Sequence, residues 1–233
     1  MLELDSVSAG YGKARILNDL SLKVDRGQVV ALLGRNGAGK STTMKTVIGL
    51  LAATAGRVKF LGEDITRFPC HRTAQLGVGY VPEDRRVFPE LSVDENLEVG
   101  RQPPREGFTP WSADALFKLF PNLLERRKNL GKQLSGGEQQ MLTIARTLMG
   151  NPQLILLDEP SEGLAPRIVE QMAETIIKLK ASGMTVLLSE QNLHFARLVA
   201  DHAYVIEKGS VCFDGSIAAL DDNPEILATY LAV

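Results

Sequence analysis

The sequence of 233 residues predicts an α/β fold with a largely parallel sheet, an antiparallel β subdomain and an α-helical insertion. Short apolar strand candidates alternate with amphipathic helical stretches, which is typical of a parallel sheet. Other strand candidates alternate apolar and polar residues, as half-exposed antiparallel strands do. Strand signals are absent between residues 90 and 150. We therefore expect a single domain, residues 1–233, in which 1–89 and 151–233 form the core with the antiparallel β subdomain and 90–150 form the helical subdomain.

Five uninterrupted apolar runs are expected to be buried strands, because both faces of a strand in a parallel sheet are covered. They are Val29–Leu33, Val78–Val81, Leu154–Leu157, Val186–Leu188 and Tyr204–Ile206. Three alternating segments are expected to be antiparallel strands: Leu2–Leu4, Ser21–Val24 and Val58–Phe60. Residues 207–210 have the composition of a hairpin turn, and Val211–Phe213 follows as a last short strand.

The insertion carries signals for helix starts. Ser92 and Glu95 form a capping-box pattern, and a second helix is expected near Ser112. Pro104 and Pro110 lie between these positions and indicate a connecting loop.

The composition is that of an ordinary soluble globular protein, with 44% hydrophobic and 23% charged residues. The net charge is −2 and no basic run is present, which argues against nucleic acid as a partner. Cys70 and Cys212 lie far apart and show no zinc-type spacing, so neither a disulfide framework nor a zinc site is expected. The amino terminus lacks a signal-peptide pattern, and no apolar run approaches the roughly 20 residues of a membrane span.

One segment fits the phosphate-binding loop pattern G-x-x-x-x-G-K-[ST], the Walker A motif. It consists of Gly34, Arg35, Asn36, Gly37, Ala38, Gly39, Lys40 and Ser41. A strand precedes this loop directly and a helical stretch follows it, which is the context in which such a loop binds phosphate. The glycines let backbone N–H groups approach an anion, and the helix N-terminus adds positive partial charge. Lys40 is expected to reach the β- and γ-phosphates, and the Ser41 hydroxyl is expected to ligate Mg²⁺.

Two acids follow the strand Leu154–Leu157. Asp158 is expected to join the ligands of Mg²⁺, and Glu159 is expected to orient or deprotonate an attacking water. Because side chains alternate along a strand, the two carboxylates are expected to point to different sides. The alternative is a solvated strand end.

The segment Leu134–Gln140 reads LSGGEQQ. Ser135 and Glu138 form a capping-box pattern for a helix over Gln139–Met149, and the two glycines leave backbone N–H groups open to a phosphate. The segment resembles the signature of ATP-binding cassette (ABC) ATPases, and the resemblance covers essentially the whole chain. It implies a P-loop NTPase (RecA-like) core, hydrolysis of ATP with Mg²⁺, and a dimer in which each signature completes the ATP site of the opposite subunit.

The resemblance also assigns individual residues. The signature residues that would contact the other subunit's ATP are Ser135, Gly136, Gly137 and Glu138, and Thr42 would join the nucleotide-binding loop. Tyr11 falls where these ATPases stack an aromatic ring on adenine. Without the resemblance, Tyr11 would be expected to pack at a strand edge.

Four strings are similar to the LivF-type ATPase subunits of bacterial branched-chain (hydrophobic) amino-acid importers. They are GRN (34–36), YVPEDRRVFPELSVDENL (80–97), DEPSEGLAP (158–166) and LLSEQN (187–192). Importers of urea or short amides carry similar strings, so the solute stays open. The implied partners are a second ABC ATPase subunit (a paralogue or a second copy), two transmembrane permease subunits and, indirectly, a periplasmic solute-binding protein.

Three positions depart from the general cassette pattern. Glu83 stands where most cassettes have a glutamine that touches Mg²⁺, and its charge could be offset by Arg85 or Arg86. Ala165 replaces an aspartate that usually crosses the dimer interface. Gln191 replaces a histidine that usually contacts the γ-phosphate. His194 is expected to lie on the following helix, with a catalytic role as the less favoured alternative.

The strand Thr185–Leu188 is expected to lie beside the strand that ends at Asp158, with its polar tip at the ligand-binding edge of the sheet. At that tip Gln191 is expected to donate a hydrogen bond to the γ-phosphate, and a helix cap is the alternative. The loop Glu83–Phe88 and the helical insertion are expected to form a groove for a permease helix. Val87 and Phe88 are its expected anchors, and packing of Phe88 in the core of the insertion is the alternative.

The sequence therefore predicts a cytoplasmic ATPase subunit, peripheral on the inner face of the plasma membrane, that powers an importer. Cassettes of DNA repair or translation usually carry long coiled-coil insertions or tandem cassettes, which 233 residues do not include. A regulator that binds but does not hydrolyse nucleotide is disfavoured, because Lys40 and Glu159 are both present.

Overall fold

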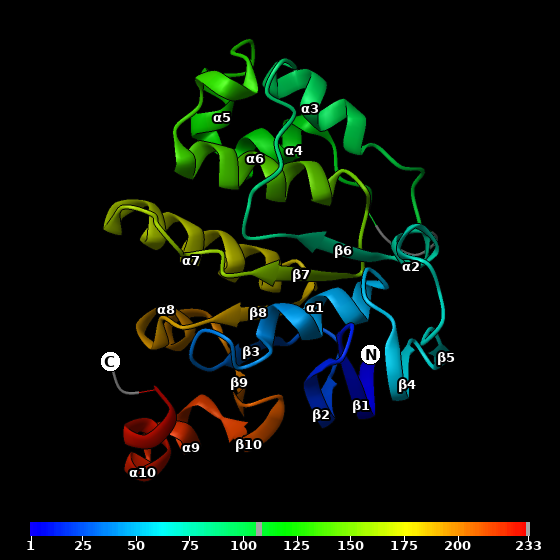
Figure 1. Cartoon of the computed structure of the whole chain (residues 1–233). Helices are drawn as coiled ribbons and strands as arrows, with labels where there is room; N and C mark the ends of the chain where they lie inside the picture. Colours follow the sequence, from blue (N-terminus) through cyan, green and yellow to red (C-terminus); the bar gives the residue numbers. More distant parts are fainter. Residues whose placement is uncertain (106–108, 232–233) are drawn as a thin grey trace.

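A computed structural model of the chain describes residues 1–105 and 109–231, and the parts of the expected subdomains at 106–108 and 232–233 lie outside them. A six-stranded sheet runs through the middle of the molecule, and a four-stranded sheet packs beside it (Figure 1). Helices cover both faces of the larger sheet. This arrangement confirms the predicted fold class.

The six-stranded sheet has the order β10-β9-β3-β8-β7-β6. Its strands are β3 (Val29–Leu33), β6 (Val78–Val81), β7 (Leu154–Asp158), β8 (Thr185–Glu190), β9 (His202–Glu207) and β10 (Ser210–Ser216). All neighbours are parallel except β9 and β10, which form the expected hairpin. The carboxyl ends of β3, β6, β7 and β8 therefore meet at one edge, where four loops lie close together.

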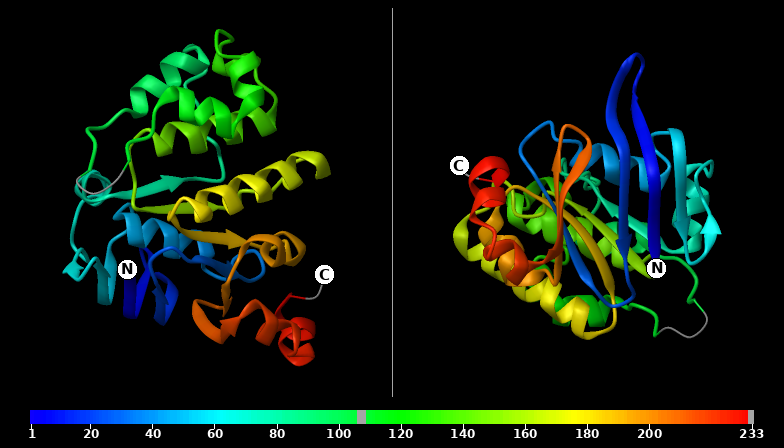
Figure 2. Two further views of the ribbon diagram at one scale, coloured as in Figure 1. Left: turned by 180° about the vertical axis from the view of Figure 1, so that it is seen from behind. Right: turned by 90° about the horizontal axis from the view of Figure 1, so that it is seen from below.

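The four-stranded antiparallel sheet has the order β2-β1-β4-β5. Its strands are β1 (Leu2–Tyr11), β2 (Ala14–Val24), β4 (Ala53–Phe60) and β5 (Glu63–Asp64). β1 and β2 extend well beyond the alternating segments that predicted them, and Figure 2 shows their hairpin projecting from the rest of the chain. β2 contacts β10 through Asn18, whose backbone oxygen accepts from Ser210 Oγ at 2.9 Å.

The helices fall into groups according to the strands that they connect. Around the larger sheet lie α1 (Lys40–Ile48), α2 (Cys70–Leu76), α7 (Pro166–Ala181) and α8 (Leu193–Val199). Between β6 and β7 lie α3 (Val93–Gly100), α4 (Ala113–Leu119), α5 (Pro121–Glu125), η1 (Gly131–Gln133) and α6 (Gly136–Leu148). The chain ends with α9 (Ile217–Asp221), α10 (Pro224–Ile226) and a π-helical turn, η2 (Leu227–Leu231). The predicted capping boxes at Ser92 and Ser135 are both present.

Two hydrophobic clusters hold these layers together. The two clusters lie on opposite faces of the larger sheet. Side chains alternate along β3, so Val29, Ala31 and Leu33 belong to one cluster, and Val30 and Leu32 belong to the other. The first cluster joins the sheet to the insertion and to α7, and the second joins it to α1 and the antiparallel sheet. The larger sheet is therefore covered on both faces, as its apolar strands predicted. Within the described parts of the chain, every helix is too short or too polar to cross a bilayer.

Candidate active site

The loop from Gly34 to Gly39 connects β3 to α1 and is fixed by close backbone contacts. Gly34 has φ 155°, and a Cβ there would lie 2.5 Å from Ile206 O, so a larger residue would clash with β9. Gly39 caps α1 in the left-handed region at φ 115°. Gly209, in the turn between β9 and β10, donates its N–H to Ala38 O at 2.8 Å. The β9–β10 hairpin therefore supports the phosphate-binding loop from outside.

Lys40 is buried, with 4% of its side chain exposed. Its Nζ donates to Gly34 O at 2.7 Å and to Arg35 O at 3.2 Å, which places the ammonium inside the curve of the loop. The same nitrogen lies 3.0 Å from Glu159 Oε1, whose side chain is 6% exposed. The two residues expected to act on the γ-phosphate and on water thus share one buried site.

Asp158 accepts hydrogen bonds from three hydroxyl groups. Ser41 Oγ lies 2.9 Å and Ser189 Oγ 2.7 Å from Oδ1, and Tyr80 OH lies 3.1 Å from Oδ2. Ser189 pairs directly with Asp158 across β7 and β8, and Tyr80 on β6 pairs with Leu156, two positions before Asp158 on the same face. The sequence analysis missed Ser189 and Tyr80; their positions follow from strand register, which single-strand patterns do not reveal.

Ser41 and Asp158 offer oxygen ligands of the kind that Mg²⁺ prefers. Magnesium sites in nucleotide enzymes commonly use one or two carboxylate or hydroxyl groups, with phosphates and water completing the shell. In the described residues no group of three or more His, Cys, Asp or Glu side chains could hold a metal by itself. The donor set therefore fits Mg²⁺ held jointly with a nucleotide.

Glu159 has φ 48°, an unusual value for a residue other than glycine. Its backbone N–H donates to Ser189 O and to Ser189 Oγ, each at 3.1 Å, and these bonds stabilise the strained backbone. As expected, the side chains of Asp158 and Glu159 have different partners. Gln191 Nε2 lies 3.5 Å from Glu159 Oε1, the oxygen that Lys40 Nζ also approaches.

Glu190 is the tip of β8 and is buried. Its Oε1 accepts the Ser161 N–H at 3.0 Å and its Oε2 accepts the Asn192 N–H at 3.3 Å. Burial raises the pKa of Glu190 to about 7, although the hydrogen bond from Ser161 acts in the opposite direction. Glu190 thus joins the loop after β7 to the start of α8, a role the sequence analysis did not assign.

Asn192 is the cap of α8, because its side chain accepts the Phe195 N–H at 3.1 Å. The alternative in which Gln191 caps this helix is therefore wrong. His194 lies on α8, as expected, and its side chain is exposed.

The signature segment lies apart from the phosphate-binding loop of the same chain. It begins α6, which lies in the upper part of the molecule with β7 and α7 between it and α1 (Figure 1). Ser135 Oγ accepts the Glu138 N–H at 3.3 Å, and Glu138 Oε2 accepts the Ser135 N–H at 2.8 Å. A Cβ on Gly137 would lie 2.7 Å from Ile168 Cγ2, so α6 packs closely on α7 at this point.

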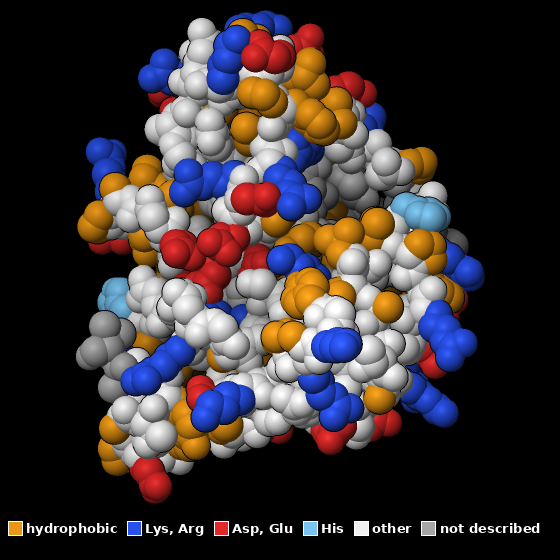
Figure 3. Space-filling model, in the orientation of Figure 1, with side chains coloured by type: hydrophobic (Ala, Val, Ile, Leu, Met, Phe, Trp, Pro, Cys, Tyr) orange, Lys and Arg blue, Asp and Glu red, His pale blue; other side chains and the backbone are white. Residues whose placement is uncertain are grey.

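Glu83 lies at the edge of an acidic region. The pKa of its carboxyl is raised, first by partial loss of solvation and then by Glu162, Asp158 and Glu159. Figure 3 shows acidic side chains gathered at the middle of the molecule beside Lys and Arg side chains. Arg86 pairs with Asp84 at 2.8 Å and Arg85 Nη2 lies 3.5 Å from Glu162 O, so within the described chain neither arginine pairs with Glu83.

The predicted adenine-stacking residue, Tyr11, and the position that departs from the cassette pattern at the dimer interface, Ala165, are both exposed. Tyr11 ends β1 at the tip of the projecting hairpin, with 49% of its surface accessible. Ala165 is exposed and precedes Pro166 at the start of α7. Neither lies among the buried groups around Asp158.

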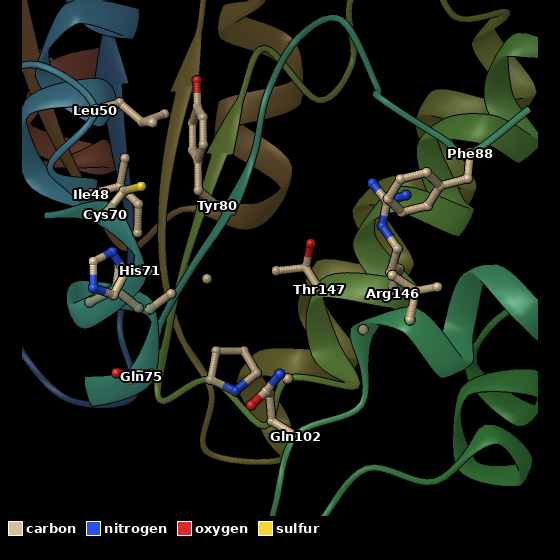
Figure 4. A pocket seen from close by; sticks show the side chains of 17 residues that line it. Ile48, Leu50, Cys70, His71, Gln75, Tyr80, Phe88, Gln102, Arg146 and Thr147 are labelled. Carbon is tan, nitrogen blue, oxygen red and sulfur yellow. The ribbon is translucent and has the colours of Figure 1, made fainter.

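A groove of about 590 Å³ lies between the core and the helical insertion (Figure 4). Leu50 and His71 line one wall, Phe88 and Arg146 line the other, and Tyr80 lies between them. Phe88 is 43% exposed, and the Arg146 guanidinium stacks on its ring at 4.8 Å from the centroid. Phe88 thus faces the groove, whereas Val87 is partly buried and packs against the cluster that joins the sheet to the insertion.

Comparison with known proteins identifies the family of this chain. The family profile described as ABC transporter matches residues 17–162. The high-affinity branched-chain amino acid transport ATP-binding protein BraG of Pseudomonas aeruginosa is 44% identical, over 99% of both chains. The lipopolysaccharide export system ATP-binding protein LptB of Haemophilus influenzae is 36% identical, over 99% of this chain and 97% of the relative. The probable branched-chain amino acid transport ATP-binding protein LivF of Archaeoglobus fulgidus is 36% identical, over 93% and 92%.

A solved structure of an ABC transporter cassette has the same fold as this chain. A nucleotide-free ATP-binding cassette from an ABC transporter superposes with a TM-score of 0.83 at 28% identity, over 97% of each chain. The family match, the full-length relatives and the geometry around Lys40 and Asp158 agree. This chain belongs to the ABC transporter family and is a nucleotide-binding, ATP-hydrolysing subunit of a transporter.

Proposed function

We propose that this subunit powers an importer of branched-chain or other hydrophobic amino acids from the inner face of the plasma membrane. The observation that supports the solute class is the similarity to BraG along both whole chains. The observation that supports the chemistry is the meeting of Lys40, Glu159 and Asp158 at the carboxyl edge of the sheet.

Each residue of the site has a separate task in this proposal. The loop Gly34–Thr42 binds the phosphates through backbone N–H groups and the Lys40 ammonium. Ser41 and Asp158 hold Mg²⁺, which would neutralise charge that develops on the phosphate oxygens, and Glu83 faces that site from the loop after β6. Glu159 orients the attacking water, and Gln191 adds a hydrogen-bond donor beside it.

The remaining residues act between subunits. Ser135, Gly136, Gly137 and Glu138 lie apart from their own phosphate-binding loop, which fits a site completed by a second cassette. That cassette is a paralogue or a second copy of this chain. Tyr11, exposed at the hairpin tip, stacks on adenine.

The groove between core and insertion fits a helix of a permease subunit. Leu50, Phe88 and Val99 expose 53%, 43% and 53% of their surfaces there, so apolar area is available for a partner. Two permeases and, indirectly, a periplasmic solute-binding protein complete the transporter, and no nucleic acid is involved.

A second candidate shares the same chemistry but not the same cargo. LptB of Haemophilus influenzae is 36% identical over nearly the full length, so an ATPase of an export system is the alternative. An importer of urea, short amides or another small solute is a further variant of the first proposal.

The test is reconstitution with the permeases encoded beside this chain, their cassette partner and their binding protein. We expect phosphate release that rises when the binding protein carries leucine, isoleucine or valine. Stimulation by urea or an amide would show that the imported solute is one of these and not a branched-chain amino acid. Stimulation by a lipopolysaccharide would favour the second candidate. No phosphate release under any of these conditions would contradict the whole proposal.

A further inference from the structure

Tyr80 is the residue that touches both the groove and the metal-binding carboxylate. Its side chain lines the groove between Leu50 and Phe88, as Figure 4 shows. Its hydroxyl lies 3.1 Å from Asp158 Oδ2. Ser41 and Ser189 both donate to the other oxygen, Oδ1, so in the described chain Tyr80 is the side chain that holds Oδ2.

Strand geometry explains why a tyrosine reaches this atom. Tyr80 pairs with Leu156 in the parallel register of β6 and β7, and Asp158 lies two residues further along on the same face. A long side chain can cover such a diagonal distance between neighbouring strands. The ring packs on the cluster that contains α1, so it approaches Asp158 from the side on which Ser41 lies.

The Tyr80 hydroxyl donates its hydrogen to the Asp158 carboxylate. A protonated phenol donates one hydrogen bond and fixes the plane of the carboxylate that accepts it. Partners of this kind orient a metal ligand without touching the metal.

We propose that Tyr80 is a positioning residue that orients Asp158 for Mg²⁺. The proposal rests on the proposed function, because it requires Mg²⁺ at Ser41 and Asp158. Tyr80→Phe removes the hydroxyl alone and keeps the ring that faces the groove.

Tyr204→Phe is the matched control. Tyr204 is buried on β9 in the same sheet, and its hydroxyl exchanges hydrogen bonds with the backbone of Lys23 at 3.1 and 3.2 Å. Loss of this hydroxyl, on a strand three places from that of Asp158 in the sheet, removes both hydrogen bonds with Lys23, so it reports the effect of the substitution on stability alone.

The first measurement is binding of fluorescent ATP to the isolated chain, with Mg²⁺ titrated and with EDTA. In Tyr80→Phe we expect apparent Mg²⁺ affinity to fall about tenfold, while binding in EDTA stays within about twofold of wild type. Tyr204→Phe should show wild-type Mg²⁺ dependence. A Tyr80→Phe protein with wild-type Mg²⁺ dependence, whether or not its melting temperature falls, overturns the proposal.

The second measurement uses the complete transporter. Tyr80→Phe should assemble with the permeases normally, hydrolyse ATP about tenfold more slowly at limiting Mg²⁺, and recover when Mg²⁺ is raised. Turnover that stays low in saturating Mg²⁺ would contradict the positioning role. If the wild-type chain itself shows no Mg²⁺-dependent nucleotide binding, the proposed function fails and the role of Tyr80 fails with it. If only Tyr80→Phe departs from the expected Mg²⁺ dependence, the role of Tyr80 fails and the proposed function stands.

Discussion

Asp158 and Glu159 are neighbours in the chain, but their carboxylates lie in different surroundings. Asp158 continues the alternation of β7 and meets hydroxyl groups, whereas Glu159 leaves the strand at φ 48° and meets the Lys40 ammonium. A strained backbone of this kind persists only where the structure fixes it, here through two hydrogen bonds from the Glu159 N–H to Ser189. One strand end thereby supplies one group suited to a metal and another suited to water.

Gln191 offers a test of the donor beside Glu159. A glutamine amide donates a hydrogen bond but does not exchange a proton near neutral pH, so its role is positional. We expect Gln191→Ala to lower turnover at least about tenfold with ATP affinity nearly unchanged, and Gln191→His to be tolerated. Steady-state phosphate release and ATP titration measure the two effects.

The neighbouring cap provides the control for Gln191. Asn192→Ala removes the side chain that caps α8 and should lower stability by about 1 kcal/mol without a comparable loss of turnover. If Gln191→Ala instead destabilises the fold and leaves turnover per folded molecule unchanged, Gln191 has no part in the reaction.

Glu190 predicts a dependence of stability on pH. Its pKa is about 7 in the folded chain and 4.5 ordinarily, so the folded state holds a proton that the unfolded state has lost between these values. The contribution of Glu190 to the free energy of unfolding is therefore fully present below about pH 4.5 and is lost as the pH rises through about 7. At about 1.4 kcal/mol per pH unit the loss amounts to roughly 3 kcal/mol.

The test compares urea unfolding at pH 5 and pH 8. Glu190→Gln stays neutral and keeps an acceptor for the Ser161 N–H, so it should lose less stability than wild type over this interval. Glu170→Gln, at an exposed position on α7, should behave as wild type does. Equal pH dependence in Glu190→Gln and wild type would show that the buried carboxyl does not titrate in this range.

At the scale of elements, local patterns predicted most of the fold. Uninterrupted apolar runs identified the buried parallel strands, and capping boxes identified the starts of α3 and α6. The full length of β1 and β2 was not predicted, because bulges interrupt their pairing with each other and so disturb the alternation. Ser189, Tyr80 and Glu190 were missed as site residues because register between strands, which is not local, brings them to Asp158 and the loop after β7.

The exposed ring of Phe88 in the groove predicts that transport can be lost while basal ATP hydrolysis is kept. The backbone of Phe88 is held by α3, since the Asn96 side chain accepts from its N–H at 2.9 Å and donates to its carbonyl oxygen at 3.0 Å, while the Phe88 ring remains exposed. Phe88→Ala should therefore leave basal ATP hydrolysis nearly intact but weaken permease binding and abolish most transport-coupled stimulation. Leu124→Ala, which truncates a similarly exposed side chain on α5, is the control. A lowered melting temperature together with loss of basal hydrolysis would assign Phe88 to the core instead.

At the scale of the whole molecule, the phosphate-binding loop and the signature segment of one chain lie in different places. The phosphate-binding loop and Glu159 lie at the edge of the central sheet, and the signature segment begins α6 in the helical insertion (Figure 1). The proposed function therefore requires a second cassette to bring a signature segment to a nucleotide bound at Lys40. This separation is the physical reason to expect ATP to act as the link between two subunits.

Glu159→Gln tests this account most directly, because the amide keeps the size of the side chain and removes the carboxylate that would act on water. Turnover should fall roughly 10²–10⁴-fold, ATP affinity should be kept, and ATP should drive the variant, alone or with its partner cassette, into a stable dimer seen by light scattering. Ser135→Ala in the same background should weaken that dimer, since it alters the signature segment and not the phosphate-binding loop. A Glu159→Gln protein that hydrolyses ATP at the wild-type rate, or that binds ATP and stays monomeric with every partner, would contradict the account.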